Sequence, residues 1–310
     1  MFILTNSSIM SSVEASIDCE KITTIEQSYG CRMMVFPQYK SVLNFDNSTL
    51  YPLVIKASIN QESVGLLVGL QQFSSSCSIE LVSLFVQPDF RHQKVAEKLL
   101  IEFEKQSKLL AIDKINVTYM TGQKTTPYLE KLFSKRFFSV PETRMLVVRC
   151  SLDSIKPIPW LNRYSLSDDY QIKPWVDLTQ NERLEIEQSN RVEHWIADDL
   201  IPFNYEQGIE PITSLALLVG GKVRGWCLNH VVAGRLRFTC GFTHIKLQKT
   251  GKLTLLLSHI AKVMPATGLF ESMWTVPVAL HPRMAKFMLK HAKPYSTFYA
   301  ETKMVSKSIQ

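Results

Sequence analysis

Three kinds of feature are scarce in this chain of 310 residues, and each scarcity excludes a class of protein. The six cysteines form no C-x-x-C pair, which argues against a structural zinc site and suits a reducing compartment. Glycine (12) and proline (14) are near or below average usage, which excludes collagen-like and low-complexity chains. No apolar run approaches the roughly 18 residues of a membrane helix, and the N-terminus lacks the regions of a signal peptide. We therefore expect a globular, cytoplasmic protein.

Charge is spread along the chain instead of gathered in one segment. The 35 basic residues are interleaved with 28 acidic ones, which leaves a net charge of +7 and no block of lysine and arginine. Nucleic-acid-binding chains concentrate basic residues in a patch or stripe. We therefore expect neither a nucleic-acid partner nor a membrane partner. The mild basic excess suits a small ligand that carries phosphate.

The length of the chain is typical of two domains. Short apolar runs between turn residues predict an antiparallel meander in the first half, and apolar residues at helical spacing after Pro88 predict a long helix. The elements expected there are strands at 53–59, 64–73 and 78–86, a turn at 74–76, a helix at 93–111, a strand at 114–120, a helix at 126–135 and a strand at 143–151. This order indicates an α/β layer built on a mixed sheet.

The second half repeats this order of elements. Expected there are strands at 215–219, 223–232 and 236–245, a helix at 251–264, a strand at 270–276, a helix at 282–291 and a strand at 296–306. Small identities recur at matching places, such as Gly65 with Gly225 and Pro127 with Pro282. An internal repeat of this kind indicates two copies of one fold. The expected divisions are an N-terminal domain at 1–155, a connector with the first strand of the second copy at 156–174, and a C-terminal domain at 175–310.

One segment of the first half combines a strand end, a helix start and positive charge. The strand that ends at Val86 is followed by Pro88, and Arg91-His92-Gln93-Lys94-Val95-Ala96 then opens the long helix. The first turn of a helix has unpaired N–H groups and a partial positive charge, so it suits a ligand that carries phosphate. In the second half, Gln248 to Leu253 stands at the matching place.

These motifs resemble the signature of the GCN5-related N-acetyltransferase (GNAT) superfamily, in which a strand ending in V-x-P precedes Q/R-x-x-G-x-G/A at the start of a helix. The resemblance covers roughly residues 50–150 and 210–306. It implies an α/β fold of two consecutive GNAT-like domains, each a mixed, mostly antiparallel sheet flanked by helices. It also implies acetyl-CoA or a longer acyl-CoA as co-substrate and no metal. The coenzyme-binding residues expected from it are Leu84, Phe85, Val86, Arg91, His92, Gln93, Lys94, Val95, Ala96, Gln248 and Gly251.

Each copy departs from the family pattern in its own way. Lys94 stands where the family has the phosphate-loop glycine, whereas the second copy keeps a glycine at Gly251 but lacks the V-x-P before it. The thiolate acid of the family is usually a tyrosine on the short helix, and the aligned residues here are Phe133 and Met288. The sequence therefore gives no support for a separate general acid at this position.

Glu80 is the expected general base. Acyl transfer to an amine requires a group that removes a proton from the ammonium. Glu80 stands eleven positions before Arg91, in the strand where histone acetyltransferases of the superfamily carry their catalytic glutamate. The alternative is a solvent-facing strand carboxylate in a cross-strand pair. Arg237 has the equivalent place in the second copy and cannot act as a base.

The sequence leaves two functions open. The first is an N-acyltransferase that moves an acyl group from acyl-CoA to a primary amine, either a small amine or a lysine or amino group of a peptide or protein. The second is a catalytically decayed GNAT-fold module that binds acyl-CoA or a partner. Glu80 and the V-x-P favour the enzyme, whereas the residues that favour the module are Lys94, Phe133 and Met288. We expect catalysis in the first copy, because it keeps the carboxylate; the acceptor, the acyl length and the oligomeric state stay open.

Overall fold

The computed structural model describes residues 16–46, 50–72, 77–161 and 169–309. Within it the chain divides into two compact units. Unit 1 comprises residues 1–119, 123–142 and 303–310, and unit 2 comprises residues 120–122 and 143–302. The expected turn at 74–76 and part of the expected connector, residues 162–168, lie outside the described residues. No helix in the described ranges is both long enough and apolar enough to cross a membrane.

Unit 1 is built on one sheet. In spatial order its strands are β1 (Ile17–Ile22), β2 (Leu50–Ile59), β3 (Glu62–Gln72), β4 (Ser78–Val86), β5 (Lys114–Met120) and the C-terminal part of β12 (Phe298–Ser308). Neighbours from β1 to β4 are antiparallel, whereas β4 and β5 are parallel. The helices of the unit are α1 (Ile25–Ser28), α2 (Val95–Leu109) and α3 (Thr126–Lys135), with 3-10 segments at 29–34, 37–44 and 88–90.

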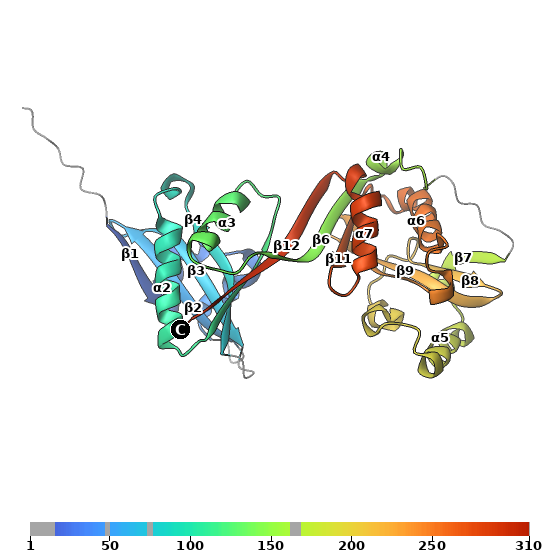
Figure 1. The fold of residues 1–310 in the computed structure, drawn as a ribbon, viewed down its shortest axis with the longest axis horizontal. Coiled ribbons are helices and arrows are strands. Elements are labelled where there is room, and N and C mark those ends of the chain that lie inside the picture. Colours follow the sequence, from blue (N-terminus) through green and yellow to red (C-terminus); the bar gives the residue numbers. More distant parts are fainter. Residues whose placement is uncertain (1–15, 47–49, 73–76, 162–168, 310) are drawn as a thin grey trace, which may run out of the picture. The chain divides into compact units, whose positions relative to one another are not determined.

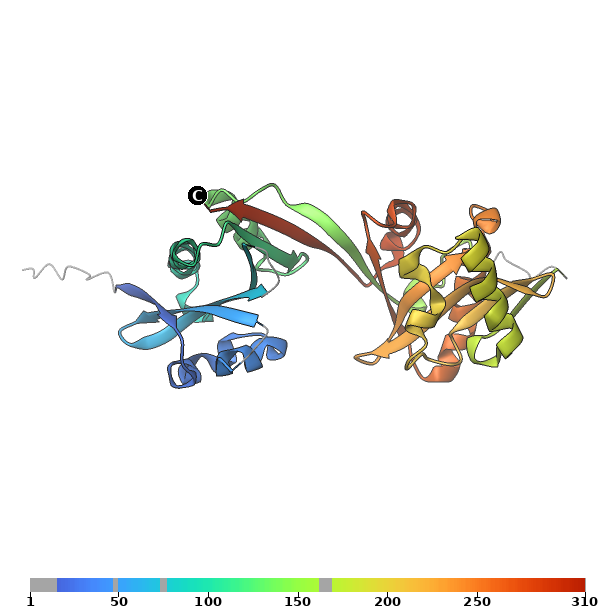
Figure 2. The same cartoon turned by 90° about the horizontal axis from the view of Figure 1, so that it is seen from below.

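A helical layer covers each face of the unit 1 sheet. On one face α2 and α3 bury Phe103 and Phe133 in the same core as Ile79 of β4. On the other face the 3-10 segments bury Leu43 in a core with Val54 of β2. Figure 2 shows these layers on opposite sides of the strands, with the 3-10 segments in dark blue. The alternation of side chains along each strand supplies both cores.

Unit 2 repeats this plan. In spatial order its strands are β6 (Glu142–Ser151), β11 (Glu271–Pro277), β10 (Arg235–Thr243), β9 (Lys222–Val232), β8 (Leu215–Val219) and β7 (Tyr170–Pro174). The strands β10 and β11 are parallel, and the other neighbours are antiparallel. Its helices are α4 (Leu152–Ile155), α5 (Gln180–Glu193), α6 (Lys252–Val263) and α7 (Pro282–His291), with 3-10 segments at 175–177, 198–200, 202–205, 245–247, 264–267 and 293–295.

The helices of unit 2 also lie on both faces of the sheet. Figure 1 shows α6 and α5 on opposite sides of β8 and β9. Leu256 of α6 shares a core with Leu217 of β8, and Ile186 of α5 shares the opposite core with Trp226 of β9. Met288 of α7 packs in a further core with β6 and β11.

The structure confirms the expected fold class, an α/β fold in which the second half repeats the first. The elements β4, β5, α3, β8 and α7 have the expected bounds. The unit limits differ from the expected domain ranges in two places, because residues 143–155 belong to unit 2 and residues 303–310 to unit 1. β6 pairs with β11 along its length, and Val305 of β12 is buried in the unit 1 core. A strand joins the sheet whose edge and core it completes, whatever its place in the chain.

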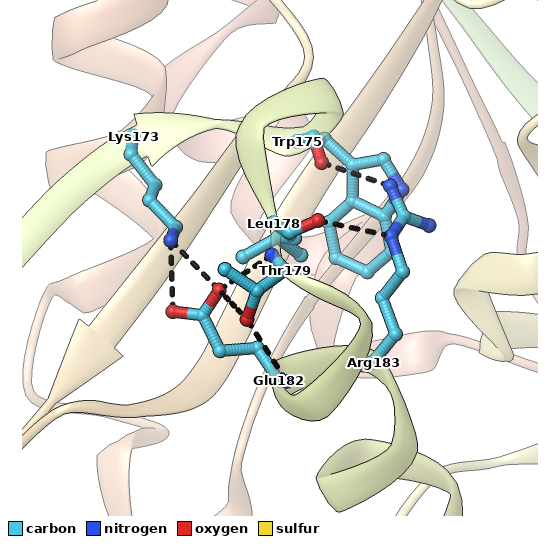
Figure 3. Close-up of polar contacts among 6 residues, drawn as sticks. All are labelled: Lys173, Trp175, Leu178, Thr179, Glu182 and Arg183. Atoms are coloured by element: carbon cyan, nitrogen blue, oxygen red, sulfur yellow. Dashed lines mark hydrogen bonds and ion pairs between the residues drawn. The ribbon is translucent and has the colours of Figure 1, made fainter.

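Polar contacts fix the start of α5 (Figure 3). The side chain of Thr179 accepts a hydrogen bond from the N–H of Glu182, and the Glu182 carboxylate accepts one from the N–H of Thr179, which makes a capping box. Lys173 of β7 places Nζ 2.8 Å from each Glu182 carboxylate oxygen. Arg183 donates to two carbonyls of the segment before the helix. The hydrogen bond from Lys173 lowers the pKa of Glu182 below its ordinary value of 4.5.

We expect Glu182→Gln to weaken α5 at neutral pH and much less in acid. The folded-state pKa of Glu182 lies below the unfolded value of 4.5, so its stabilising contribution is complete above that value and is lost as the pH falls through the folded-state pKa. Amide hydrogen exchange in α5 measures the effect: protection should fall in the variant at pH 7, and the difference from wild type should shrink in acid. The control is Glu187→Gln, because Glu187 forms an exposed pair with Arg191 at 3.7 Å, and such pairs contribute little to stability. Equal protection of wild type and Glu182→Gln at pH 7 would contradict this account.

Candidate functional site

The strands β4 and β5 separate part-way along their length. They pair over residues 78–81 of β4 and 114–117 of β5, and no pairing continues beyond these residues in the described part of the chain. β4 runs on beside β3 to Val86. The edge of β4 that faces β5 therefore has backbone N–H and C=O groups without a strand partner over residues 82–86. An extended ligand can form strand-like hydrogen bonds with such an edge.

A β-bulge lies where the strands separate. Val68 of β3 pairs with Ser83, and the next residue, Gly69, pairs with Leu81, so Val82 is an extra residue in β4. A bulge bends its strand and increases the local twist. The bend therefore coincides with the start of the opening between β4 and β5. The bulged residue is a valine, so no turn residue at this position predicts the bulge from the sequence.

Glu80 lies on β4 two residues before the bulge. Its neighbours Ile79 and Leu81 are buried in the core under α2, so alternation places the Glu80 side chain on the opposite face of the sheet. Thr118 of β5 donates a hydrogen bond of 3.0 Å to Oε1 of Glu80. Among the described residues no lysine or arginine forms an ion pair with this carboxylate. A hydroxyl thus holds the carboxylate beside the opening and leaves its charge uncompensated.

The loop between β4 and α2 presents a run of N–H groups. His92 and Lys94 have φ values of 63° and 64°, in the left-handed region, and Lys94 is the N-cap of α2. The N–H of Arg91 bonds to Pro88 and that of Lys98 to Lys94, but the N–H groups of residues 92–97 have no acceptor in the described part of the chain. A run of unpaired N–H groups at a helix start is an anion-binding arrangement.

The expected coenzyme-binding residues of unit 1 contribute in two ways. Those whose side chains pack in the cores, and which offer only backbone groups, are Leu84, Phe85, Val86 and Val95. Arg91 donates from Nε to the carbonyl of Val86 at 3.2 Å, and Gln93 donates to the carbonyl of Asp89 at 3.0 Å. The His92 ring lies edge-on to Tyr128 of α3, with 4.7 Å between ring centroids. Arg91, His92, Gln93 and Lys94 are exposed, so their side chains face solvent around the loop.

Unit 2 has the same opening between its two parallel strands. β10 and β11 pair only over residues 236–238 and 272–274 within the described ranges. β10 runs on beside β9 to Thr243, and Thr239 is the bulged residue. Val82 and Thr239 stand at the same distance before their respective loops, so the two bulges are equivalent.

The loop between β10 and α6 in unit 2 also matches the loop between β4 and α2 in unit 1. Lys249 and Gly251 have φ values of 67° and 80°, and Gly251 is the N-cap of α6. Gln248 donates from Nε2 to the carbonyl of Thr243 at 3.2 Å, the counterpart of the Arg91 contact. The expected residues therefore form two sites: Glu80 and residues 84–96 lie in unit 1, and Gln248 and Gly251 lie in unit 2.

The side chains around the unit 2 opening differ from those of unit 1. Arg237 occupies the position of Glu80, and its buried Nε has no partner among the described residues. His244, at the end of β10, is buried against Trp195 and accepts a hydrogen bond from the N–H of Lys246. Burial lowers the pKa of His244, and the charge of Arg224 lowers it further. These contacts make His244 a neutral, structural histidine.

The positions of the family tyrosine are apolar and buried in both units. Phe133 is 2% exposed and Met288 is fully buried. Tyr119, near the end of β5, packs against Phe133 and donates a hydrogen bond of 3.0 Å to Glu130. Burial and this hydrogen bond raise the pKa of Tyr119 well above its ordinary value of 10, so its hydroxyl keeps its proton. In the described ranges no group of three or more His, Cys, Asp or Glu side chains could hold a metal ion.

Sequence reasoning missed three features of the site. The bulges at Val82 and Thr239 lack turn residues, and the partner of Glu80, Thr118, is 38 positions away in the sequence. The opening between the parallel strands depends on where their pairing stops. Each of these features is set by strand register, which no local pattern in a single sequence encodes.

Comparisons with known proteins place the fold. No protein-family model matches the sequence, and no curated protein matches it. A tandem GNAT protein from the clavulanic acid biosynthesis pathway matches with a TM-score of 0.50 at 10% identity, over 95% of this chain and 99% of that one. A GCN5-related N-acetyltransferase from Sphaerobacter thermophilus matches with a TM-score of 0.53 at 13% identity, over 95% of this chain and 96% of that one. A GCN5-related glucosamine N-acetyltransferase region of a fungal multi-domain β-N-acetylglucosaminidase matches with a TM-score of 0.53 at 11% identity. This match covers 94% of this chain and 38% of that one.

The chain thus has the tandem GNAT fold, which confirms the resemblance found in the sequence at the level of the fold. Both units carry the parallel strand pair that separates at a bulge, and in both a loop with a left-handed N-cap opens the helix that follows. At identities of 10–13% the likeness extends to the fold alone.

We expect Lys94→Gly to stabilise the protein, because Lys94 has a left-handed backbone that costs a non-glycine residue about 1 kcal/mol. The reciprocal change in unit 2, Gly251→Lys, should destabilise by a similar amount, since Gly251 has the same conformation. Urea unfolding of the two variants measures the changes in the free energy of unfolding. A loss of stability in Lys94→Gly would show instead that the lysine side chain makes a stabilising contact.

Proposed function

We propose that the protein is an N-acyltransferase that moves an acyl group from an acyl-CoA thioester to a primary amine. One observation carries this proposal. A carboxylate at Glu80, an unpaired strand edge at 82–86 and a loop of unpaired N–H groups at 92–97 follow one another along β4 and the start of α2. A pantetheine arm laid along that edge would have its phosphates at the loop and its thioester near Glu80.

The loop residues would bind the coenzyme by charge and by backbone hydrogen bonds. The N–H groups of residues 92–97 suit the diphosphate, and the exposed side chains of Arg91 and Lys94 add positive charge. The backbone of Leu84, Phe85 and Val86 would pair with the pantetheine amides. Gln248 and Gly251 would belong to the corresponding coenzyme-binding loop of unit 2.

Glu80 is proposed as the base of the reaction in unit 1. The carboxylate takes a proton from the acceptor ammonium, and the amine nitrogen then attacks the thioester carbonyl carbon. The C–S bond breaks, the nitrogen loses its second proton to solvent as the amide forms, and the coenzyme thiolate takes a proton from solvent, because the aligned positions Phe133 and Met288 carry no acid. The acceptor class is a small amine, or a lysine or amino group of a peptide or protein. The donor is acetyl-CoA or a longer acyl-CoA.

A second candidate function is an acyl-CoA-binding or interaction module without catalysis. The left-handed Lys94 in place of glycine and the buried Phe133 and Met288 favour it. Thermal unfolding with and without acetyl-CoA, together with an assay for thiol release from amine acceptors, separates the two. A rise in Tm without turnover on any amine would favour the module, whereas turnover supports the enzyme.

Glu80→Gln should lower the turnover number by about 10² to 10⁴, the usual contribution of general base catalysis, while the KM for acetyl-CoA stays nearly constant. Steady-state kinetics of coenzyme A release measure both constants. Glu62→Gln, an exposed strand carboxylate on β3, is the control and should leave turnover unchanged. Turnover close to wild type in Glu80→Gln across pH 6 to 9 would exclude this base.

Replacing both Arg91 and Lys94 with Glu should raise the KM for acetyl-CoA by at least about tenfold, with less effect on turnover, because the charges bind ground state and transition state alike. The control carries the same change of charge at the far end of α2, Lys105→Glu with Lys108→Glu, and should leave the KM near its wild-type value. An unchanged KM in the first variant would move the donor site to the unit 2 loop at 248–253.

A further inference from the structure

His281 and Asp199 form a hydrogen-bonded pair in unit 2 that the proposed reaction does not use. His281 Nε2 lies 2.6 Å from Asp199 Oδ2, and the two side chains are 23% and 41% exposed. His281 stands four residues after the end of β11 and is the N-cap of α7. Asp199 lies in the 3-10 segment 198–200. The two residues are 82 positions apart in the sequence, so only the fold brings them together.

The pair joins layers on the two faces of the unit 2 sheet. Trp274 of β11 packs in the cores of both α6 and α7, which places these helices on one face. Leu200, next to Asp199, packs in the core of the other face. Two such layers can touch only beyond the sheet or where its strands have separated.

The His281–Asp199 pair lies at the opening between β10 and β11. On the Asp199 side, the carbonyl of Leu200 accepts a hydrogen bond of 3.4 Å from Cys240, the residue after the bulged Thr239. On the His281 side, the N–H of His281 bonds to the carbonyl of Pro277, the last residue of β11. The pair therefore connects the two strands where their pairing has ended.

We infer that His281, oriented by Asp199, is the general base of a second acyl-transfer centre in unit 2. This inference rests on the proposed function, because it assumes that a thioester reaches the opening of unit 2 as well. The carboxylate of Asp199 accepts a hydrogen bond from the N–H at Nε2 and so favours the neutral tautomer that has its lone pair on Nδ1. No group among the described residues bonds to Nδ1, which is available to a substrate.

The step that we assign to this pair balances without a further reactant. Nδ1 takes one proton from the ammonium of the acceptor, and the amine nitrogen attacks the thioester carbonyl carbon. Asp199 stabilises the imidazolium that forms. The C–S bond then breaks, and the thiolate takes the proton from Nδ1, while the second proton of the nitrogen passes to solvent. The products are the amide and coenzyme A.

The two units would then use different positions for the same role. Arg237 stands at the Glu80 position of unit 2 and cannot accept a proton. Conversely, Thr126 stands at the His281 position of unit 1, just before the proline of the short helix, and its hydroxyl accepts a hydrogen bond from the N–H of Gln123. Each opening therefore carries one candidate base, which lies on a strand in unit 1 and at the start of the short helix in unit 2.

The test compares wild type, Glu80→Gln, His281→Gln and the double variant, with acetyl-CoA as donor and spermidine, glucosamine and a lysine-containing peptide as acceptors. We expect unit 2 to be the slower centre, so that it supplies the turnover that remains in Glu80→Gln, about 10⁻² to 10⁻⁴ of the wild-type value. We expect the double variant, Glu80→Gln with His281→Gln, to have a turnover number about 10² to 10⁴ below that of Glu80→Gln, with little change in the KM for acetyl-CoA. Asp199→Asn should reduce the turnover number of Glu80→Gln by about tenfold or more, because the tautomer is no longer favoured. His291→Gln, at the other end of α7, is the control and should leave it unchanged.

Each outcome decides a separate point. If His281→Gln leaves the transfer rate unchanged for every acceptor, both alone and in the Glu80→Gln background, the unit 2 centre is overturned and the proposed function still stands. Loss of all turnover in Glu80→Gln alone would overturn it as well. No transfer by wild type to any acceptor would instead overturn the proposed function, and the second centre with it.

Discussion

The geometry of each unit depends on one constraint: two parallel strands stop pairing in the middle of a sheet. Backbone N–H and C=O groups at such an edge need partners, which side chains, water or an extended ligand can supply. In unit 1 the edge runs over residues 82–86, and in unit 2 over 239–243. The bulges bend β4 and β10 at these points, and the loop that follows each strand ends in a left-handed N-cap that exposes helix N–H groups. The coenzyme site that we propose is made of these backbone groups.

This reliance on backbone explains how two copies can differ so much in side chains and still share one geometry. A side chain five residues after the strand donates to the carbonyl of the last strand residue in both units, Arg91 in one and Gln248 in the other. The N-cap is Lys94 in one and Gly251 in the other, with nearly the same φ. Side chains that act in chemistry are under no such common constraint, since Glu80 and Arg237 share a position but not a charge. A repeat can therefore keep its backbone geometry while the side chains at equivalent positions diverge.

Periodicity and turn residues were enough to predict β4, β5, α3 and α7, because each alternates or repeats strongly and is bounded by Gly, Pro or polar turns. The 3-10 segments at 29–44 have no such period, and they were not predicted. The unit limits at 142 and 303 could not be found either, because they depend on which sheet edge a strand completes. The loop at 91–96 and Glu80 follow from a local motif, whereas Thr118 and the His281–Asp199 pair depend on contacts distant in sequence.

The central claim is that acyl-CoA lies along the unpaired edge of β4. A crystal structure of the protein with a non-hydrolysable acetyl-CoA analogue tests it most directly. The account predicts pantetheine amides hydrogen-bonded to the backbone of residues 82–86, the diphosphate on the N–H groups of 92–97, and the carbonyl that replaces the thioester on the Glu80 side of the opening. A coenzyme bound away from β4 and the loop that opens α2, or crystals in which this edge stays without ligand at saturating analogue, would contradict it.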